Sequence, residues 1–259
     1  MENKVVLKRG REKAILNHHH WIFSGAIEEW PDFENGEILS VFSHDREFLG
    51  RAYFNKKTSI AGRMLTFDNI EVDLVLKDNI KKAIKFRATF FGRETNSYRL
   101  INSEGDFLPG LIVDRYNNIL VIQIATAGME KLKKTIVDIL VKELKPKGIY
   151  EKSDSSSRLE EGLEKFEGKI YGSIDEQIKI LENNHKFIVD LANGQKTGFY
   201  FDQREMRKLT ESLSSGRKVL NCFSYTGGFS VYAMKGGALK VDSIDVSKRA
   251  IEILQENFK

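Results

Sequence analysis

The sequence contains little cysteine, little proline and no long apolar run. Cys222 is the single cysteine, which excludes an intrachain disulfide framework and a multi-cysteine zinc site. No run approaches the ~18 consecutive apolar residues that a membrane helix needs. The N-terminal Met-Glu-Asn-Lys also lacks the apolar core of a secretory signal. We therefore expect a cytoplasmic protein that makes no membrane contact.

The composition is that of a globular protein with an uneven charge distribution. A hydrophobic share of 41% is ample for packed cores, and the length is typical of about two domains. Residues 191–259 carry 11 Lys and Arg against 7 Asp and Glu, whereas residues 1–76 carry 10 against 12. The basic surplus therefore lies in the C-terminal part. Such a surplus suits a polyanionic partner without establishing one.

Residues 1–75 are predicted to form short strands separated by turns. The runs with strand-like composition are residues 5–7, 36–42, 48–54 and 60–65. A small antiparallel barrel is the simplest assembly of these strands. His18, His19 and His20 follow one another between the first two strands. Because adjacent side chains point in different directions, we interpret them as loop residues and expect no metal site.

Residues 76–190 alternate between helical and strand periods. Residues 77–93 place apolar side chains at helical spacing among lysines and arginines, which predicts a basic amphipathic helix with a solvated face. A strand-strand-helix-strand-strand domain follows, with its helix over residues 129–144. The polar stretch 152–162 breaks every period and predicts a mobile surface loop. A hairpin over residues 177–190 completes the predicted sheet.

The C-terminal region changes from an apolar run to a small polar turn and then to a helical pattern. Val219 and Leu220 begin the strand, and the residues from Thr226 to Gly228 open the helix. Such a turn after a first strand is where doubly wound sheets bind nucleotides. Only about two strands fit after Lys218, whereas a doubly wound domain needs roughly five. We therefore predict part of a Rossmann-like domain.

Two segments of this region resemble motifs of a known family. They are Gln195-Lys-Thr-Gly-Phe-Tyr-Phe-Asp-Gln-Arg204 and Asn221-Cys-Phe-Ser-Tyr-Thr-Gly-Gly-Phe229. Both are similar to segments of the class I S-adenosylmethionine (AdoMet)-dependent ribosomal RNA large-subunit methyltransferases, in the cytosine-C5 branch with an N-terminal PUA domain. Residues 19–25 and 104–116 match the same family. The resemblance therefore covers nearly the whole chain.

The resemblance implies a mixed α/β and β fold in three parts. The first is a PUA-like RNA-binding β-barrel over residues 1–75, and the second is a central strand-strand-helix-strand-strand domain over residues 76–190. The third is the N-terminal part of a Rossmann-like AdoMet-dependent methyltransferase domain over residues 191–259. The family further implies S-adenosyl-L-methionine as the cofactor and 23S ribosomal RNA as the partner, and a homodimer is compatible with it.

An AdoMet site needs close backbone approach, an acceptor for the ribose hydroxyls and groups for the amino-acid tail. The predicted contacts in the turn come from Phe223, Ser224, Tyr225, Thr226, Gly227 and Gly228. Its two glycines permit close approach at a helix N-terminus. Asp245 ends the next predicted strand, at the spacing expected of a ribose acceptor. Its competing role is to cap the helix that begins at Ser247.

The segment before the turn adds further candidates. Tyr200 and Gln203 are predicted to contact the cofactor. Lys196, Arg204 and Trp21 are the candidate RNA-binding residues, because cations bind phosphates and aromatic rings stack on bases. A capped helix with aromatic anchors is the alternative interpretation of this segment.

The family's catalytic motifs do not occur in these residues. Pro31, Pro109 and Pro146 are the only prolines, and none belongs to the family's Asp-Pro-Pro segment. C5 of cytosine is a poor nucleophile until a thiolate adds at C6. Cys222 ends a predicted buried strand, so we interpret it as a small structural residue. We therefore predict no catalytic residue in this chain and an inactive fragment of an enzyme.

Other functions stay open from the residues. The turn lacks a Gly-x-Gly-x-Gly pattern, so without the family NAD, other nucleotides and AdoMet are equally compatible with it. One alternative is a non-catalytic RNA-binding module, or one piece of a split enzyme. Another is a ribosomal RNA methyltransferase that acts on guanine.

Overall fold

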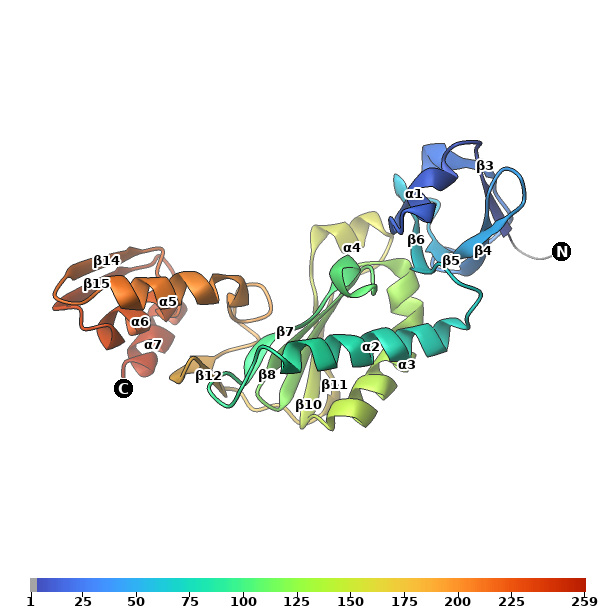
Figure 1. The fold of residues 1–259 in the computed structure, drawn as a ribbon. Coiled ribbons are helices and arrows are strands. Elements are labelled where there is room, and N and C mark those ends of the chain that lie inside the picture. The colour runs from blue at the N-terminus through green and yellow to red at the C-terminus, as the bar shows by residue number, and fades with distance from the viewer. Residues whose placement is uncertain (1–3) are drawn as a thin grey trace. The chain divides into compact units, whose positions relative to one another are not determined.

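The computed structural model describes residues 4–259, which divide into two compact units (Figure 1). The first unit consists of residues up to 89 with residues 100–113 and 121–173, and the second of residues 90–99, 114–120 and 174–259. None of the helices within the described range is long and apolar enough to cross a membrane.

The N-terminal part of the first unit is a curled half-barrel. Its elements are β1 (Lys4–Leu7), α1 (Glu12–Leu16), β2 (Trp21–Phe23), η1 (Ser24–Ala26), β3 (Ile27–Glu29), β4 (Ile38–Phe42), β5 (Phe48–Phe54) and β6 (Ile60–Thr66). The strand order is β2-β6-β5-β4-β1-β3, with β2 and β3 at the edges. The apolar core lies inside the curl and includes Val5, Leu39 and Met64.

One strand pair of the half-barrel corrects the predicted antiparallel barrel. β1 and β4 run parallel, with Val5 opposite Val41. A parallel pair needs a crossover connection between its strands. Here α1, β2 and β3 provide that connection. The short α1, β2 and β3 fall in the stretch around the three histidines, where no periodicity predicted an element.

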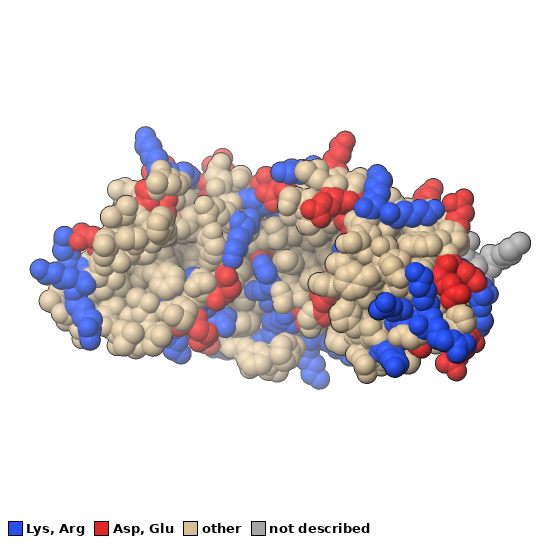
Figure 2. All heavy atoms as spheres, turned by 90° about the horizontal axis from the view of Figure 1, so that it is seen from above, with Lys and Arg blue, Asp and Glu red and all other residues tan. Residues whose placement is uncertain are grey.

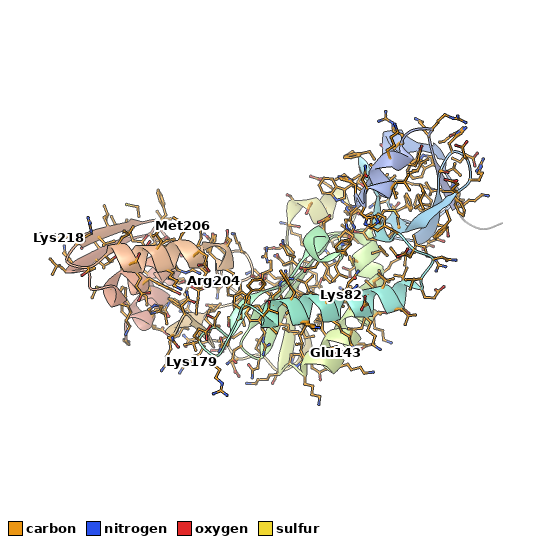
Figure 3. All side chains as sticks on the ribbon, in the orientation of Figure 1. Lys82, Glu143, Lys179, Arg204, Met206 and Lys218 are labelled. Carbon is orange, nitrogen blue, oxygen red and sulfur yellow. The ribbon has the colours of Figure 1, made fainter. Side chains whose placement is uncertain are left out.

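Helix α2 (Val72–Ala88) confirms the predicted basic amphipathic helix but begins and ends earlier than residues 77–93. The buried residues of the helix begin with Val72 and Leu76. Glu71, which has an extended backbone, is its N-cap. The charged face is exposed, as predicted: Lys81 Nζ lies 3.2 Å from Glu143 Oε1 of α3 (Ala127–Leu144). Lys82 and Glu143 are labelled in Figure 3.

A five-stranded sheet with the order β11-β10-β9-β8-β7 forms the central part. Its elements besides α3 are β7 (Ser97–Asn102), η2 (Ser103–Asp106), β8 (Leu111–Tyr116), β9 (Ile119–Ile124), β10 (Gly148–Ser153), α4 (Ser156–Glu160) and β11 (Phe166–Gly172). The predicted helix and the strands before it are confirmed. β11 is an additional edge strand that no prediction included.

The predicted mobile loop over residues 152–162 is wrong, because this stretch is a structured part of the sheet's surroundings. It contains the end of β10 and all of α4. Lys152, Arg158 and Glu161 are buried. The Arg158 guanidinium donates a hydrogen bond to the carbonyl of Ile124 (2.8 Å). Polar composition misled the prediction because buried polar groups with partners look like surface residues in a sequence.

Buried polar contacts join the half-barrel to the central sheet. Tyr53 of β5 donates its hydroxyl to the carbonyl of Pro109 at 2.8 Å. Asn55 Nδ2 donates to Glu161 Oε2 at 2.7 Å, and Arg63 donates to Glu161 Oε1 at 2.7 Å. We call this group around Glu161 the junction cluster. It lies wholly within the first unit.

The second unit is built from a hairpin, a parallel strand pair and three helices. Its elements are β12 (Ile178–Glu182), β13 (His185–Val189), η3 (Phe201–Gln203), α5 (Arg204–Leu213), β14 (Lys218–Cys222), α6 (Gly228–Lys235), β15 (Lys240–Ile244) and α7 (Lys248–Asn257). β14 and β15 are parallel, with Val219 opposite Val241. The predicted order of strand, turn, helix, strand and helix is confirmed.

The hairpin does not complete the central sheet as predicted, since β12 and β13 form a two-stranded sheet of their own. Phe187 of β13 stacks on Tyr232 of α6, and the Ile188 amide donates to Asn257 of α7. Arg207 of α5 forms a buried ion pair with Glu182 of β12 at 2.8 Å. Alternating apolar residues predict a half-buried strand but do not specify which elements will cover it.

Candidate functional site

The predicted cofactor turn follows β14 directly, at the carboxyl ends of the parallel pair. The Ser224 amide donates to the carbonyl of Ile244, the last residue of β15, at 2.9 Å. Asn257 Nδ2 of α7 donates to the carbonyl of Thr226 at 2.8 Å. The turn is therefore fixed on one side by β15 and on the other by α7. The carboxyl ends of such strands are where open α/β sheets bind ligands.

Every second residue of the turn, from Phe223 to Gly227, has a left-handed backbone conformation. Phe223 has φ +57°, Tyr225 +48° and Gly227 +81°. Residues other than glycine rarely adopt this region and usually do so where the surrounding structure requires it, as at ligand sites. At Gly227 a Cβ atom would lie 2.7 Å from Leu254 Cγ. Glycine is therefore required there for two reasons, the positive φ and the close approach of α7.

The turn presents unpaired polar groups that fit an AdoMet tail. α6 begins at Gly228, so the amides of its first turn have no partner within the helix, and the helix dipole favours an anion there. Ser224 is buried, and its hydroxyl has no hydrogen-bond partner among the described residues. A buried hydroxyl without a partner is costly unless a ligand supplies one.

Asp245 follows β15 and faces the same turn. Its Oδ2 accepts a hydrogen bond from the Tyr225 amide (2.8 Å) and its Oδ1 from the Ser247 amide (2.9 Å). Each carboxylate oxygen keeps a second lone-pair site for a ribose hydroxyl. The N-cap of α7 is Ser247, whose Oγ accepts from the Ala250 amide at 3.2 Å. Asp245 is therefore not the capping residue.

Tyr225 connects the turn to the segment that precedes α5. Its hydroxyl accepts from the Gln195 amide (2.9 Å) and donates to the Gly198 carbonyl (3.0 Å). Burial raises the pKa of Tyr225 to about 12, so this hydroxyl keeps its proton at neutral pH. Tyr200 packs edge-on against Tyr225, with ring centroids 5.4 Å apart. Gln203 lies in η3, and no hydrogen bond within residues 4–259 joins it to the turn.

The two basic RNA candidates of this unit are held by neighbouring side chains. Lys196 Nζ lies 3.1 Å from Asp202 and 4.3 Å from the ring centroid of Tyr200. Arg204 begins α5 (Figure 3), and its guanidinium carbon lies 4.5 Å from the ring centroid of Phe91. Both cations are ordered by aromatic rings. Among residues 4–259, no hydrogen bond or ion pair joins either cation to the turn.

Trp21, the third RNA candidate, lies in the first unit on the wall of a cavity. The cavity has a volume of about 480 Å³, and Arg11, His19 and Phe23 also line it. Trp21 Nε1 donates to Glu104 Oε1 at 2.9 Å, which orients the indole ring. Arg11 and Phe23 were not among the candidate RNA-binding residues predicted from the sequence, and His19 was interpreted as a loop residue. The mixture of cationic and aromatic residues between positions 11 and 23 was the available signal.

The three adjacent histidines have separate environments. His18 stacks on Phe67 with ring centroids 4.6 Å apart, whereas His19 lines the cavity. His20 is buried, and its Nδ1 lies 3.1 Å from the carbonyl oxygen of Met64. Burial lowers the pKa of His20 below its usual value of 6.5. His20 is therefore a neutral core residue at neutral pH.

Cys222 is exposed, which corrects the prediction of a buried strand end. Along β14, Val219 and Asn221 alternate with the exposed Leu220 and Cys222. The Asn221 side chain bonds Ser230 of α6, so the helices cover only that face of the strand pair. Cys222 therefore lies on the face that no element within residues 4–259 covers.

Comparison with known proteins assigns both ends of the chain. A model of PUA-like domains matches residues 5–67, and a model of S-adenosylmethionine-dependent methyltransferases matches residues 165–259. The chain therefore combines a PUA-like domain with part of a domain of the AdoMet-dependent methyltransferase class.

The relatives specify the family. Ribosomal RNA large subunit methyltransferase I of Escherichia coli is 37% identical over 264 residues, covering 100% of this chain and 67% of the relative. The enzyme of the same name from Aeromonas hydrophila is 38% identical, with 99% and 66% covered. The chain belongs to the ribosomal RNA large subunit methyltransferase I family, which confirms the resemblance found in the sequence. It spans about two thirds of the length of these curated relatives.

Solved structures agree with this assignment. A candidate SAM-dependent methyltransferase from Streptococcus mutans has a TM-score of 0.82 at 26% identity, covering 100% of this chain and 67% of that one. A candidate methyltransferase complexed with SAH has a TM-score of 0.84 at 26% identity, covering 100% of this chain and 66% of that one. The predicted fold class is confirmed.

Proposed function

We propose that the full-length protein transfers a methyl group from AdoMet to C5 of a cytosine in large-subunit ribosomal RNA. The turn after β14 is the observation that supports the AdoMet part of this proposal, and the cytosine C5 target comes from the family resemblance. It combines the Ser224 hydroxyl, which has no partner among the described residues, the first amides of α6, which have no partner within the helix, and the carboxylate of Asp245. These groups complement the amino-acid tail and the ribose of one cofactor.

Each group of the turn has a role in holding AdoMet. The first amides of α6 and the Ser224 hydroxyl bind the carboxylate of the amino-acid tail. Asp245 accepts the ribose hydroxyls, since its oxygens each have one protein donor and capacity for another. Gly227 and Gly228 let the cofactor approach the backbone. Bound AdoMet supplies an electrophilic methyl group on its sulfonium.

We further propose that the 259 residues do not catalyse transfer by themselves. Methylation at C5 needs a thiolate that adds to C6 of the base, and a base that later removes the C5 proton. Cys222 is the single thiol of the sequence, and its side chain is exposed. It lies on β14 away from the face that packs on α6. No residue of this chain is therefore assigned a catalytic role.

RNA binding by the first unit rests on the cavity that Trp21 lines. Its apolar floor, aromatic walls and the Arg11 guanidinium suit an unstacked base beside a phosphate. Basic and acidic side chains alternate over the surface in Figure 2. A local site of this kind, rather than a uniform positive field, is therefore the proposed anchor. Lys196 and Arg204 are proposed as additional contacts in the second unit.

The chemistry is tested with the full-length protein, AdoMet carrying a labelled methyl group and large-subunit ribosomal RNA transcripts. After digestion, mass spectrometry of the nucleosides should show label in 5-methylcytidine. Label in a methylguanosine would show that the target base is guanine and not cytosine. RNA binding without any methyl transfer would support the non-catalytic module. The same assay with the 259-residue chain should yield no labelled nucleoside.

RNA affinity provides a second test of the partner. Binding should weaken steeply as salt is raised, because phosphate contacts release counterions. A flat salt response would contradict a phosphate-binding surface. Homodimer formation and a cytoplasmic location are proposed from the family alone, and light scattering measures the first.

A further inference from the structure

We infer that Thr197 and Tyr116 are positioning residues for the cofactor turn, acting through the loop of residues 194–199 and Tyr225. The inference rests on the proposed AdoMet site. Neither residue belongs to the turn, and Tyr116 comes from β8, far away in the sequence. All the groups involved lie within the second unit.

A directed series of buried hydrogen bonds holds the loop. Thr197 Oγ1 donates to Asp114 Oδ2 at 2.6 Å, because a carboxylate only accepts. The Tyr116 hydroxyl, 2.8 Å from Thr197 Oγ1, must then donate to it, and it accepts from the Phe199 amide at 3.0 Å. Arg99 Nε holds Asp114 at 2.9 Å. Thr197, Asp114 and Tyr116 are all fully buried.

Burial keeps the series in one protonation state. The pKa of Tyr116 is raised well above its usual value, first by burial and then by the neighbouring Asp114 carboxylate. Its hydroxyl therefore remains a donor to Thr197. Because every donor has one acceptor, the loop has a single satisfied arrangement. A change at Thr197 removes a donor to Asp114 and the acceptor of Tyr116 together.

Gly198 leaves the loop no room to adjust. Its φ of +128° lies in a region that other residues rarely adopt, and a Cβ atom would lie 2.8 Å from Val189 Cγ1. The carbonyl of this glycine accepts the hydrogen bond of the Tyr225 hydroxyl at 3.0 Å. The position of the loop therefore determines the position of the Tyr225 ring.

Tyr225 transfers this constraint to the cofactor site through its two ends. Its hydroxyl is held by the loop, at Gln195 and Gly198, while its amide donates to Asp245 Oδ2 at 2.8 Å. Its φ of +48° lies in a region that residues other than glycine rarely adopt, which is typical of a residue held by its surroundings. If the loop shifts, Asp245 loses a donor that orients its carboxylate toward the ribose. A site that is not preorganised binds its ligand more weakly.

A matched control separates positioning from stability. Tyr232 of α6 is also fully buried in the second unit, and its hydroxyl lies 3.0 Å from Glu182 Oε1. The hydrogen-bond partners of this hydroxyl within residues 4–259 are both in Glu182, so it does not bond the loop or the turn. Tyr232→Phe and Tyr116→Phe therefore remove comparable buried hydroxyls. Only the second belongs to the series that reaches Tyr225.

The affinity test uses the full-length protein and S-adenosylhomocysteine in isothermal calorimetry. Thr197→Val should weaken binding about five- to tenfold, as expected for the loss of one buried hydrogen-bonded group. Thr197→Ser, which keeps the hydroxyl, should bind within about twofold of the parent. Unchanged affinity in Thr197→Val would overturn the inference, and so would an equal loss in Tyr232→Phe.

A second readout needs no ligand and uses the 259-residue chain. Amide hydrogen exchange over residues 219–229 should accelerate in Thr197→Val and Tyr116→Phe, because the Tyr225 amide loses its fixed partner. Tyr232→Phe should leave this segment protected. Protection unchanged in all three variants would overturn the coupling. If the full-length protein binds no S-adenosylhomocysteine, the proposed AdoMet site fails, while the exchange result still decides the coupling.

Discussion

The junction cluster of the first unit and the cofactor turn of the second differ in how completely their polar groups are paired. Both oxygens of Glu161 accept hydrogen bonds from other parts of the same unit. In the turn, the buried Ser224 hydroxyl has no partner within residues 4–259. Because natural proteins pair their buried polar groups, the chain itself completes the junction, whereas we propose that a ligand completes the turn.

The two regions also differ in how their apolar residues are covered. The half-barrel buries its core side chains, such as Leu39 and Met64, inside the curled sheet. In contrast, Leu220 of β14 is 62% exposed and Ile244 of β15 is 58% exposed. A sheet covered on both faces is typical of parallel strands. In the second unit, helices cover one face of the strand pair, and no element within residues 4–259 covers the other face.

The largest expected effect tests the junction. Glu161→Ala leaves Arg63, whose side chain is only 13% exposed, without its carboxylate. Removing one partner of such a buried pair costs about 3–5 kcal/mol. Urea unfolding should show this loss in the 259-residue chain. Glu160→Ala, at the exposed neighbouring position, is the control and should stay within about 0.5 kcal/mol of the parent. Equal losses of stability in the two variants would contradict the role of Glu161 in completing the junction cluster.

The next largest effect concerns the turn, and it is measured as a change in AdoMet affinity rather than in stability. Asp245→Ala removes the proposed ribose acceptor, and a hydrogen bond to a charged group contributes about 1.5–3 kcal/mol. AdoMet binding by the full-length protein should therefore weaken roughly 10- to 100-fold. Asp242→Ala is the control, because this carboxylate lies on β15, just before Asp245 in the chain, but pairs with Lys240. Calorimetry with equal affinities for the two variants would refute the ribose assignment.

A smaller effect depends on pH and concerns the first unit. The pKa of His20 is lowered in the folded state by burial. Below its usual value of 6.5, the unfolded chain binds a proton that the folded chain does not, so stability should fall as the pH decreases. His20→Gln should reduce this pH dependence in urea unfolding measured above and below pH 6.5. An identical pH dependence in the parent and in His20→Gln would argue against a buried neutral His20.

The smallest effect concerns the exposed face of the strand pair. Cys222→Ser should change the free energy of unfolding by no more than about 0.5 kcal/mol, because the side chain is exposed. Methyl transfer by the full-length protein should survive the change. In the native 259-residue chain, a thiol reagent should modify Cys222 without denaturant. Protection of the thiol until unfolding would show that this face is covered.

Local patterns predicted the elements better than their partners. The turn at Thr226 to Gly228 and the helix after it could be read from the residues, because glycine and helix-start signals act within a few positions. The burial of Arg158 could not, since its partner Ile124 lies in another element. The parallel pairing of β1 with β4 was missed for the same reason: strand composition carries no information on direction.

The sequence by itself determined the order of strand, turn, helix, strand and helix after Lys218, the family and the position of the turn after β14. Each of these depends on residue types at fixed local spacing. Only the tertiary structure decided that Glu161 completes the junction, that Tyr225 is held by the loop at Gly198, and that Cys222 is exposed. These facts depend on contacts between residues distant in the chain, and local periodicity does not encode them.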